Sequence, residues 1–536
     1  MNRLVVIIAI VLTGGTLSSA LSAQDNRERN PDFEYIRHSD PWLTGYNAAG
    51  LYLLPLDDIS VAEVSFDKSN GKFVNYYQSD NSFTLGGKAE SFYRLSPKAV
   101  MYGMVSYENF QGRNMGGSAF INPYYNPFDI VEHADTNIGK KQMEHYHLIG
   151  AASIDLYKGL KLGGKIDYLA ANYAKFKDLR HKNKLLDMSL TVGLSYPVNS
   201  FLEVGANYFY RRSTEGIVFH AYGNTDRQYY SLINFGAFFG RREILGNTGY
   251  TRDNENNPLF NEFHGGSLQL QLFFSPQITF FNEFTYKKRD GYFGKRSPNT
   301  IVYSNHNSGI MEYSGRFSLL SGKNRHSIAF SAANEELENH ENIYKIENNE
   351  GNNNDVVYYG KNKMLDKKTL TAQLEYTGNL NVVDFNPLWV LKAVAGFSQR
   401  QQTTSVYPYY RKQTVRVFDA NLSANRNIFA EGQVFSIGLN TGFNAGSGTD
   451  KNDGMYTSNS DDGANPSSLD ASLYREYEYL TASHIKAGAA FRYARPINQD
   501  VSAYVAINYQ FIKALDIKHL PGDTFGSFTI KFGCEF

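Results

Sequence analysis

The stretch YHLIGAASIDL, Tyr146 to Leu156, alternates between two kinds of side chain. Apolar or small residues occupy its even positions, and polar residues such as His147, Ser153 and Asp155 occupy odd positions. Because successive side chains of a β-strand point to opposite faces, a period of two predicts a strand with one apolar and one polar face.

The same pattern recurs along the chain. LKLGGKIDY, Leu160 to Tyr168, repeats it directly after a short turn at Tyr157 to Gly159, so the two segments are predicted to form a hairpin. Further alternating runs span 186–195, 202–211, 268–274 and 501–511.

The length of these runs separates two kinds of all-β protein. Strands of a soluble sandwich are usually about five or six residues long, whereas these runs reach roughly ten or more. A strand that crosses a bilayer needs about 9 to 11 residues, and lipid offers no partner to an unpaired backbone group. The pattern therefore favours a single antiparallel transmembrane β-barrel.

The connections between the runs alternate in length. About eight short turns, for example at Ser275 and Pro276, lie between long polar loops. Counting from these turns predicts about 18 strands, with 16 or 14 as alternatives because the opening strand, between Ile59 and Tyr77, is the weakest. In outer-membrane barrels short turns are periplasmic and long loops are extracellular. The predicted long loops are 111–144, 213–264, 289–309, 339–366 and 445–479.

Both ends of the chain carry export features. Asn2 and Arg3 precede an apolar run, Leu4 to Leu12, and small residues follow to Ala23, so residues 1–23 are predicted to be a signal peptide rather than a membrane anchor. We expect residues 24–58 to form a periplasmic or lumen-filling segment and residues 59–536 to form the barrel, which places the protein in a Gram-negative outer membrane.

The last strand ends in a terminal aromatic residue. Phe532 and Phe536 alternate with polar residues, and this ending resembles the signal by which the barrel-assembly machinery selects its clients. That machinery and outer-membrane lipid are therefore expected partners.

Composition excludes several functions. Lys plus Arg (53) equal Asp plus Glu (53), which argues against nucleic acid as a partner. No phosphate-binding glycine loop, nucleophile elbow or zinc-binding helix motif occurs, so neither an enzyme nor a cofactor is expected.

Two resemblances add to this interpretation. DPWLTGYNAAGLYLLP, Asp40 to Pro55, resembles the entry element of the long-chain fatty-acid transporter superfamily, in which an N-terminal segment occupies the lumen. Loops rich in Asn, Tyr and Gly, such as NPYYNPFDIVEHAD at Asn122 to Asp135, resemble uncharacterised outer-membrane barrels of the Bacteroidota.

Polar residues on the predicted inner faces are the candidate functional residues. His145 and His147, two apart on one strand, could present two imidazoles to a metal. The mixed charges suit a hydrated path or the bed of a plug. The predicted lumen-lining residues are Lys161, Lys165, Asp167, Glu203, Arg211, Glu283, Arg316, Glu375, Lys392, Lys486, Arg492 and Lys531.

We therefore expect passive or gated transport of a small solute. The alternative is a non-conducting accessory barrel whose loops bind a metal or iron chelate or a partner such as a TonB-dependent receptor.

Overall fold

The fold is described from a computed structural model of the chain. It describes residues 31–132, 137–223, 226–348, 354–430, 432–457, 465–498 and 500–536, so the predicted signal peptide lies outside the described residues.

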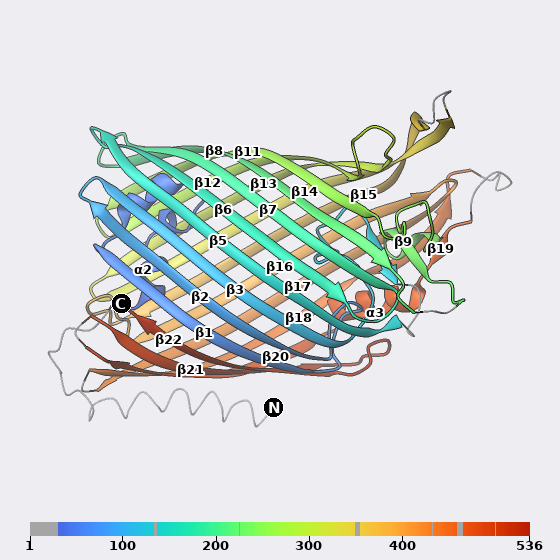
Figure 1. The fold of residues 1–536 in the computed structure, drawn as a ribbon. Helices are drawn as coiled ribbons and strands as arrows, with labels where there is room; N and C mark the ends of the chain where they lie inside the picture. Colours follow the sequence, from blue (N-terminus) through green and yellow to red (C-terminus); the bar gives the residue numbers. More distant parts are fainter. Residues whose placement is uncertain are drawn as a thin grey trace.

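Eighteen antiparallel strands, each paired with its neighbours, form one closed barrel (Figure 1). The last strand pairs with the first, from Val61 opposite Glu535 to Gly71 opposite Phe525, and this closure confirms the predicted barrel of about 18 strands. The strands are β1 (Asp58–Gly71), β2 (Asn81–Ser96), β3 (Ala99–Met115), β5 (Gly139–Tyr157), β6 (Leu160–Lys175), β7 (Arg180–Pro197), β8 (Leu202–His220), β11 (Asn256–Ser275), β12 (Ile278–Gly294), β13 (Val302–Ser321), β14 (Asn324–Asn348), β15 (Asn354–Leu380), β16 (Trp389–Val406), β17 (Tyr409–Ala430), β18 (Gln433–Met455), β20 (His484–Pro496), β21 (Ser502–Ala514) and β22 (Thr524–Glu535).

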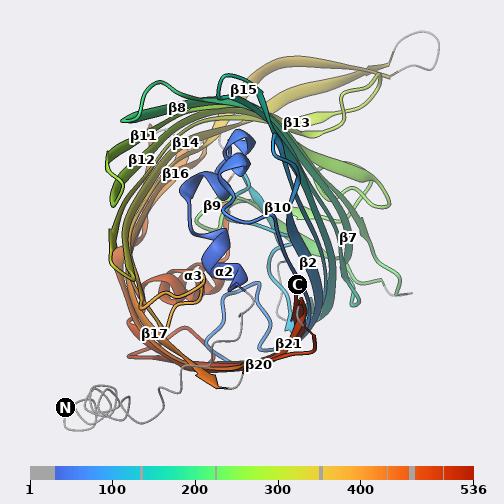
Figure 2. The ribbon, with the colours of Figure 1, turned by 90° about the vertical axis from the view of Figure 1, so that its left-hand side faces the viewer.

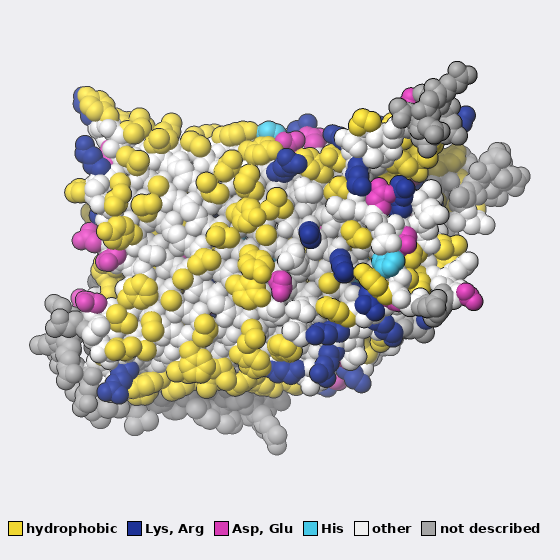
Figure 3. Space-filling model, viewed as in Figure 1, with side chains coloured by type: hydrophobic (Ala, Val, Ile, Leu, Met, Phe, Trp, Pro, Cys, Tyr) yellow, Lys and Arg dark blue, Asp and Glu magenta, His cyan; other side chains and the backbone are white. Residues whose placement is uncertain are grey.

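The outer surface carries the apolar half of the alternation. Leu148 is 45% exposed, Val192 59% and Phe532 55%, as expected only if lipid rather than water surrounds them. Figure 3 shows such side chains over one face of the barrel. A closed barrel with an apolar exterior has the architecture of an outer-membrane protein.

One end of the barrel, here the short-turn end, holds tight turns such as Tyr157–Leu160, together with the start of β1 and the end of β22. The other end, the loop end, carries the long connections (Figure 1). Two predicted loops are wrong: residues 339–366 belong mostly to β14 and β15, which pair from Arg325–Asn379 to Asn348–Asn354. Residues 289–309 belong mostly to β12 and β13, which pair as far as Gly294–Val302. Backbone hydrogen bonds extend these strands beyond the length that a bilayer requires. The polarity of the residues alone does not reveal this extension.

Short helices and a second sheet lie inside the barrel, where the wall surrounds them (Figure 2). From the short-turn end come α2 (Phe33–Arg37) and the 3-10 helices η2 (Pro41–Leu43) and η3 (Ala48–Leu53). Towards the loop end lie α3 (Asp470–Thr481) and a four-stranded sheet of β4 (Asp129–Glu132), β9 (Tyr230–Gly236), β10 (Phe239–Ile244) and β19 (Ser467–Ser468). None of the helices in the described ranges is long and apolar enough to cross a membrane.

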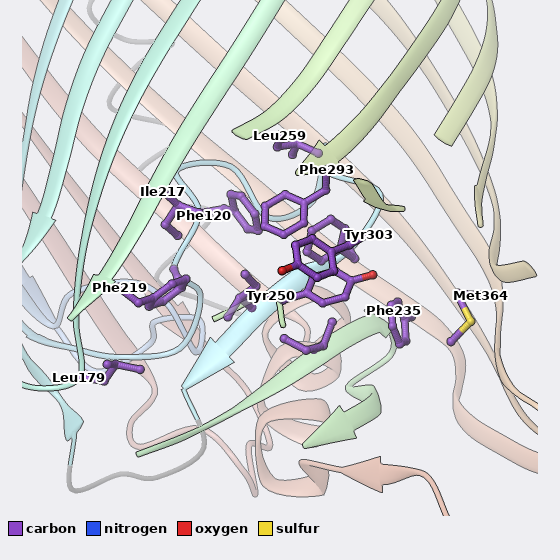
Figure 4. Close-up of a cluster of buried hydrophobic side chains, with 14 of the residues drawn as sticks. Phe120, Leu179, Ile217, Phe219, Phe235, Tyr250, Leu259, Phe293, Tyr303 and Met364 are labelled. Carbon is purple, nitrogen blue, oxygen red and sulfur yellow. The ribbon is translucent and has the colours of Figure 1, made fainter. Parts of the chain in front are cut away.

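Two apolar cores hold these inner elements. At the short-turn end, Phe33, Ile36 and Leu51 pack with inward residues of the wall. Towards the loop end an aromatic cluster joins connections to strands, and Figure 4 shows Phe120, Tyr250 and Phe293 meeting there. Tyr250 stacks on Phe293 with ring centroids 5.2 Å apart. Burial of aromatic area on this scale is the main force that draws the connections inward.

Candidate functional site: a lumen with two plugs

Residues 31–57, the N-terminal plug, lie against the inner wall of the barrel. The Asn47 side-chain amide donates to the Leu194 carbonyl oxygen at 2.9 Å and to Gln269 Oε1 at 3.1 Å. Ser153 Oγ donates to the Ala49 carbonyl oxygen at 2.8 Å. These buried bonds satisfy polar groups that the plug removes from water, so they fix its position on the wall.

Three inward glycines of the wall make room for the plug; we call Gly163, Gly193 and Gly205 the glycine cradle. A Cβ atom on Gly163 would lie 2.0 Å from the backbone nitrogen of Ala49. One on Gly193 would lie 2.2 Å from Asn47 Oδ1, and one on Gly205 would lie 2.5 Å from the Trp42 ring. The backbone approach at Gly163 tolerates no side chain.

Arginines at the short-turn end hold the plug through its carbonyl groups. Arg94 donates to the Leu54 carbonyl oxygen at 2.6 Å, and Arg316 donates to that of His38 at 3.3 Å. The latter contact gives a predicted lumen-lining residue a partner on the plug.

Residues 116–132 and 226–255, the loop plug, fill the lumen towards the loop end. Lys141 Nζ donates to the Ser118 carbonyl oxygen at 2.8 Å. Arg289 donates to that of Tyr125 at 3.0 Å, and Lys367 to that of Tyr124 at 2.9 Å. Cations of the wall thus bind carbonyl groups of an irregular segment, which keeps this backbone satisfied inside the barrel.

Asp129 sits at the centre of the loop plug. It accepts hydrogen bonds from Ser118 Oγ at 2.6 Å and from the Tyr76 hydroxyl at 3.0 Å. Burial raises the pKa of this carboxyl to about 6, and the two hydrogen bonds oppose that shift only in part.

This carboxyl should make the loop plug pH-dependent. Because its pKa when folded exceeds the ordinary 3.8, the folded plug binds the proton more tightly than an unfolded segment does, and stability falls as pH rises through the window from 3.8 to about 6. Going from pH 7 to pH 5 is therefore expected to stabilise the plug by about 1 kcal/mol. Hydrogen exchange of residues 116–132, corrected for intrinsic rates, measures this. The Asp129→Asn variant should show a smaller dependence than wild type, and an unchanged dependence would contradict the assignment.

A polar chamber separates the two plugs. A cavity of about 450 Å³ is lined by Tyr46, Glu312 and hydroxyl-bearing residues of the wall. A second cavity of about 300 Å³ shares Tyr46 and Glu312 and is also lined by Tyr125 of the loop plug. Lys287 Nζ joins the two acceptors, donating to Glu312 Oε1 at 2.6 Å and to the Tyr46 hydroxyl at 2.8 Å. The chamber is therefore lined by one residue from each plug, Tyr46 and Tyr125.

The predicted lumen-lining residues mostly form charge pairs. Lys161 pairs with Glu203 at 2.9 Å, and Glu375 with Lys392 at 2.9 Å. Further charge pairs are Arg211–Asp187 at 2.6 Å, Arg492–Glu535 at 2.6 Å and Lys531–Glu63 at 2.9 Å. Glu283 accepts a hydrogen bond from Gln269 at 2.7 Å. Lys165 and Lys486 lie partly buried on their strands.

The two histidines of the predicted metal site lie close together. Their ring centroids are 6.3 Å apart, and His147 Nε2 lies 2.7 Å from Asp167 Oδ1. Within the described residues no group of three or more His, Cys, Asp or Glu side chains is arranged to hold a metal. A metal at His145 and His147 stays a prediction that needs further ligands.

Sequence patterns alone missed the chamber residues Tyr46, Lys287 and Glu312. They also missed the cradle, although one signal was present: Gly163, Gly193 and Gly205 occupy positions of the polar face, where a strand gains nothing from glycine.

Residues 48–536 match the model of a family described as "Family of unknown function (DUF6850)". No curated protein matches the sequence significantly. The predicted similarities to fatty-acid transporters and to Bacteroidota barrels therefore stay predictions.

Solved structures of outer-membrane receptors and importers resemble the barrel at low identity. BauA, the ferric preacinetobactin receptor from Acinetobacter baumannii, gives a TM-score of 0.41 at 8% identity, covering 89% of this chain and 80% of that one. The unliganded ferric citrate transporter FecA gives 0.39 at 8%, covering 90% and 79%. The RagAB peptide importer gives 0.39 at 7%, covering 89% and 86%.

Proposed function

Since the chain belongs to this family of unknown function, over residues 48–536, we propose from its own geometry that it is a gated transport barrel for a small solute. The observation that carries the proposal is the polar chamber that lies between two plugs supplied by different parts of the chain. At 18 strands a barrel is wide enough for an aqueous channel unless something fills it, and here the two plugs do so.

The two plugs differ in how each could move to open the lumen. The N-terminal plug is one continuous segment that enters and leaves at the short-turn end, so it can withdraw without breaking any strand pairing. The loop plug is tied to the wall at both ends of each connection, and its contacts with β12 to β15 combine the aromatic cluster around Phe293 with buried polar groups. Arg289 NH2, His306 Nδ1 and both amide atoms of Asn339 are buried there without a protein partner. Underpaired polar groups weaken an interface, which favours release on this side.

Planar-bilayer conductance tests the proposal. Wild-type protein is expected to conduct weakly. A variant without residues 31–55 should conduct more, and a second deletion, with 117–131 replaced by a short Gly–Ser linker, should add a further several-fold increase. Circular dichroism and heat-modifiable migration establish that each variant is a folded barrel. A folded double variant without conductance overturns the proposal.

One observation favours a second function, an accessory barrel that binds a partner. The β14–β15 hairpin projects beyond the rim at the loop end (Figures 1 and 2), and Tyr359 on it is 61% exposed. A photo-crosslinker at Tyr359 would capture an outer-membrane partner, such as the TonB-dependent receptor suggested by the sequence analysis. Absence of any crosslink in intact cells would remove this candidate.

A further inference from the structure

Six lumen-facing positions lie in register on six adjacent strands, and we call them the polar track. Glu283 of β12 pairs with Ser314 of β13, and Ser314 pairs with Ser331 of β14. Ser331 pairs with Gln373 of β15, and Gln373 pairs with Gly396 of β16. Gly396 in turn pairs with Asp419 of β17. Adjacent strands are about 4.8 Å apart, so the track spans about 24 Å across the wall.

A second row lies beside the track towards the loop end. In register from strand to strand it contains Glu312, Ala333, Thr371 and Ser398. All four line the 450 Å³ cavity, as do all six residues of the track. The two rows therefore form one continuous and mostly polar surface of the chamber.

The neutral groups of this surface lack protein partners. Ser314, Ser331, Thr371 and Gln373 are exposed although they point away from lipid, so the space in front of them is open to water. Within the described parts of the chain, none of these four side chains forms a hydrogen bond with another protein group. Other parts of the inner wall differ, because inward polar residues such as Ser153 of β5 and Gln269 of β11 are buried against the N-terminal plug. The track is thus a part of the inner wall that remains free to bind a solute.

The chemistry of the surface limits what it can bind. It presents hydroxyl and amide groups that both donate and accept, with carboxylates at the two ends. Its residues include no Lys or Arg, which disfavours an anion. Among the described residues no group of three or more His, Cys, Asp or Glu side chains could hold a metal, which disfavours a metal ion. Few of its side chains are apolar, which disfavours a hydrocarbon.

We propose that the polar track binds a small neutral saccharide. Such a molecule carries many hydroxyl groups around a compact ring, which matches hydroxyl and amide partners that repeat from strand to strand. The chamber volume lies within the range of small-molecule sites. This inference rests on the proposed transport function, since it names the class of solute that the gated barrel accepts.

Isothermal titration of the purified full-length barrel tests this, with glucose, maltose, sucrose and raffinose as neutral probes and spermidine and gluconate as charged controls. We expect saturable binding of at least one neutral sugar and weaker binding of both charged compounds. The Ser331→Leu/Gln373→Leu variant should lose at least tenfold in affinity, about 1.4 kcal/mol. The control variant Ala395→Leu/Ala420→Leu places two leucines on the lipid face, beside Gly396 and Asp419 of the track, at residues that do not line the cavity, and should bind as wild type does.

The outcomes separate this inference from the proposed function. Three results overturn the saccharide assignment, even if the plug-deleted barrels conduct. They are no saturable binding of any neutral sugar, an equal loss of affinity in both variants, and tighter binding of spermidine or gluconate. Saccharide binding that only the track variant loses supports it, even if those barrels do not conduct, in which case the transport proposal fails alone.

Discussion

Replacing Gly163 and Gly193 by leucine is expected to expel the N-terminal plug from the barrel wall. The new Cβ atoms would lie 2.0 Å from the Ala49 nitrogen and 2.2 Å from Asn47 Oδ1. Overpacking typically costs about 1–3 kcal/mol even where side chains can adjust. At Gly163 the obstacle is backbone, which cannot rotate away, so the plug rather than the wall must move. The strand pairing of the barrel is unaffected because only inward side chains change.

Trp42 reports this movement. It is 2% exposed and is one of two tryptophans, so a Trp389→Phe background leaves it as the single emitter. In the leucine variant its emission should shift to the red and its quenching by acrylamide should increase several-fold. Gly164→Leu is the matched control, because a Cβ at this lipid-facing neighbour meets nothing within 4 Å. Unchanged quenching in the folded Gly163→Leu/Gly193→Leu barrel would show that the cradle does not hold the plug.

Replacing Arg289 by methionine is expected to loosen the loop plug. The fully buried guanidinium donates to Asn261 Oδ1 at 2.7 Å and to the Tyr125 carbonyl oxygen at 3.0 Å. It also lies over the Tyr125 ring, 4.6 Å from the centroid. Each hydrogen bond to a charged group contributes about 1.5–3 kcal/mol. Asn261 belongs to β11 of the wall, so only the bond to Tyr125 holds the plug, and its loss should raise the local opening equilibrium of the plug by about ten- to a hundredfold.

Hydrogen exchange followed by mass spectrometry measures this opening in peptides covering residues 116–132. Lys288→Met is the matched control. It changes the next residue on the same strand, whose side chain is 62% exposed and pairs with Asp290 at 3.0 Å. Equal protection in the two variants would mean that the aromatic cluster alone holds the loop plug.

The barrel itself could be predicted from the sequence. Alternation assigns each strand residue to lipid or lumen. Because successive side chains point to opposite faces, the polar residues must face the lumen once the apolar residues face lipid. Turn spacing then gave the strand number. The hairpin of β14 and β15 was predicted as a loop because polar residues predominate in its outer part and its apolar residues, such as Val356 and Val357, do not alternate with them.

Only the tertiary structure decided which segments of the chain fill the lumen. Lumen-facing residues are polar whether they meet water, a plug or a solute, so Ser153 beneath the plug and Ser331 on the polar track look alike in sequence. Closure of the barrel brings Tyr46, Tyr125 and Glu312, which are far apart in the chain, to one chamber. The sequence determined which side of each strand faces inward. Only the path of the two plugs through the barrel decided which inward residues remain free to bind.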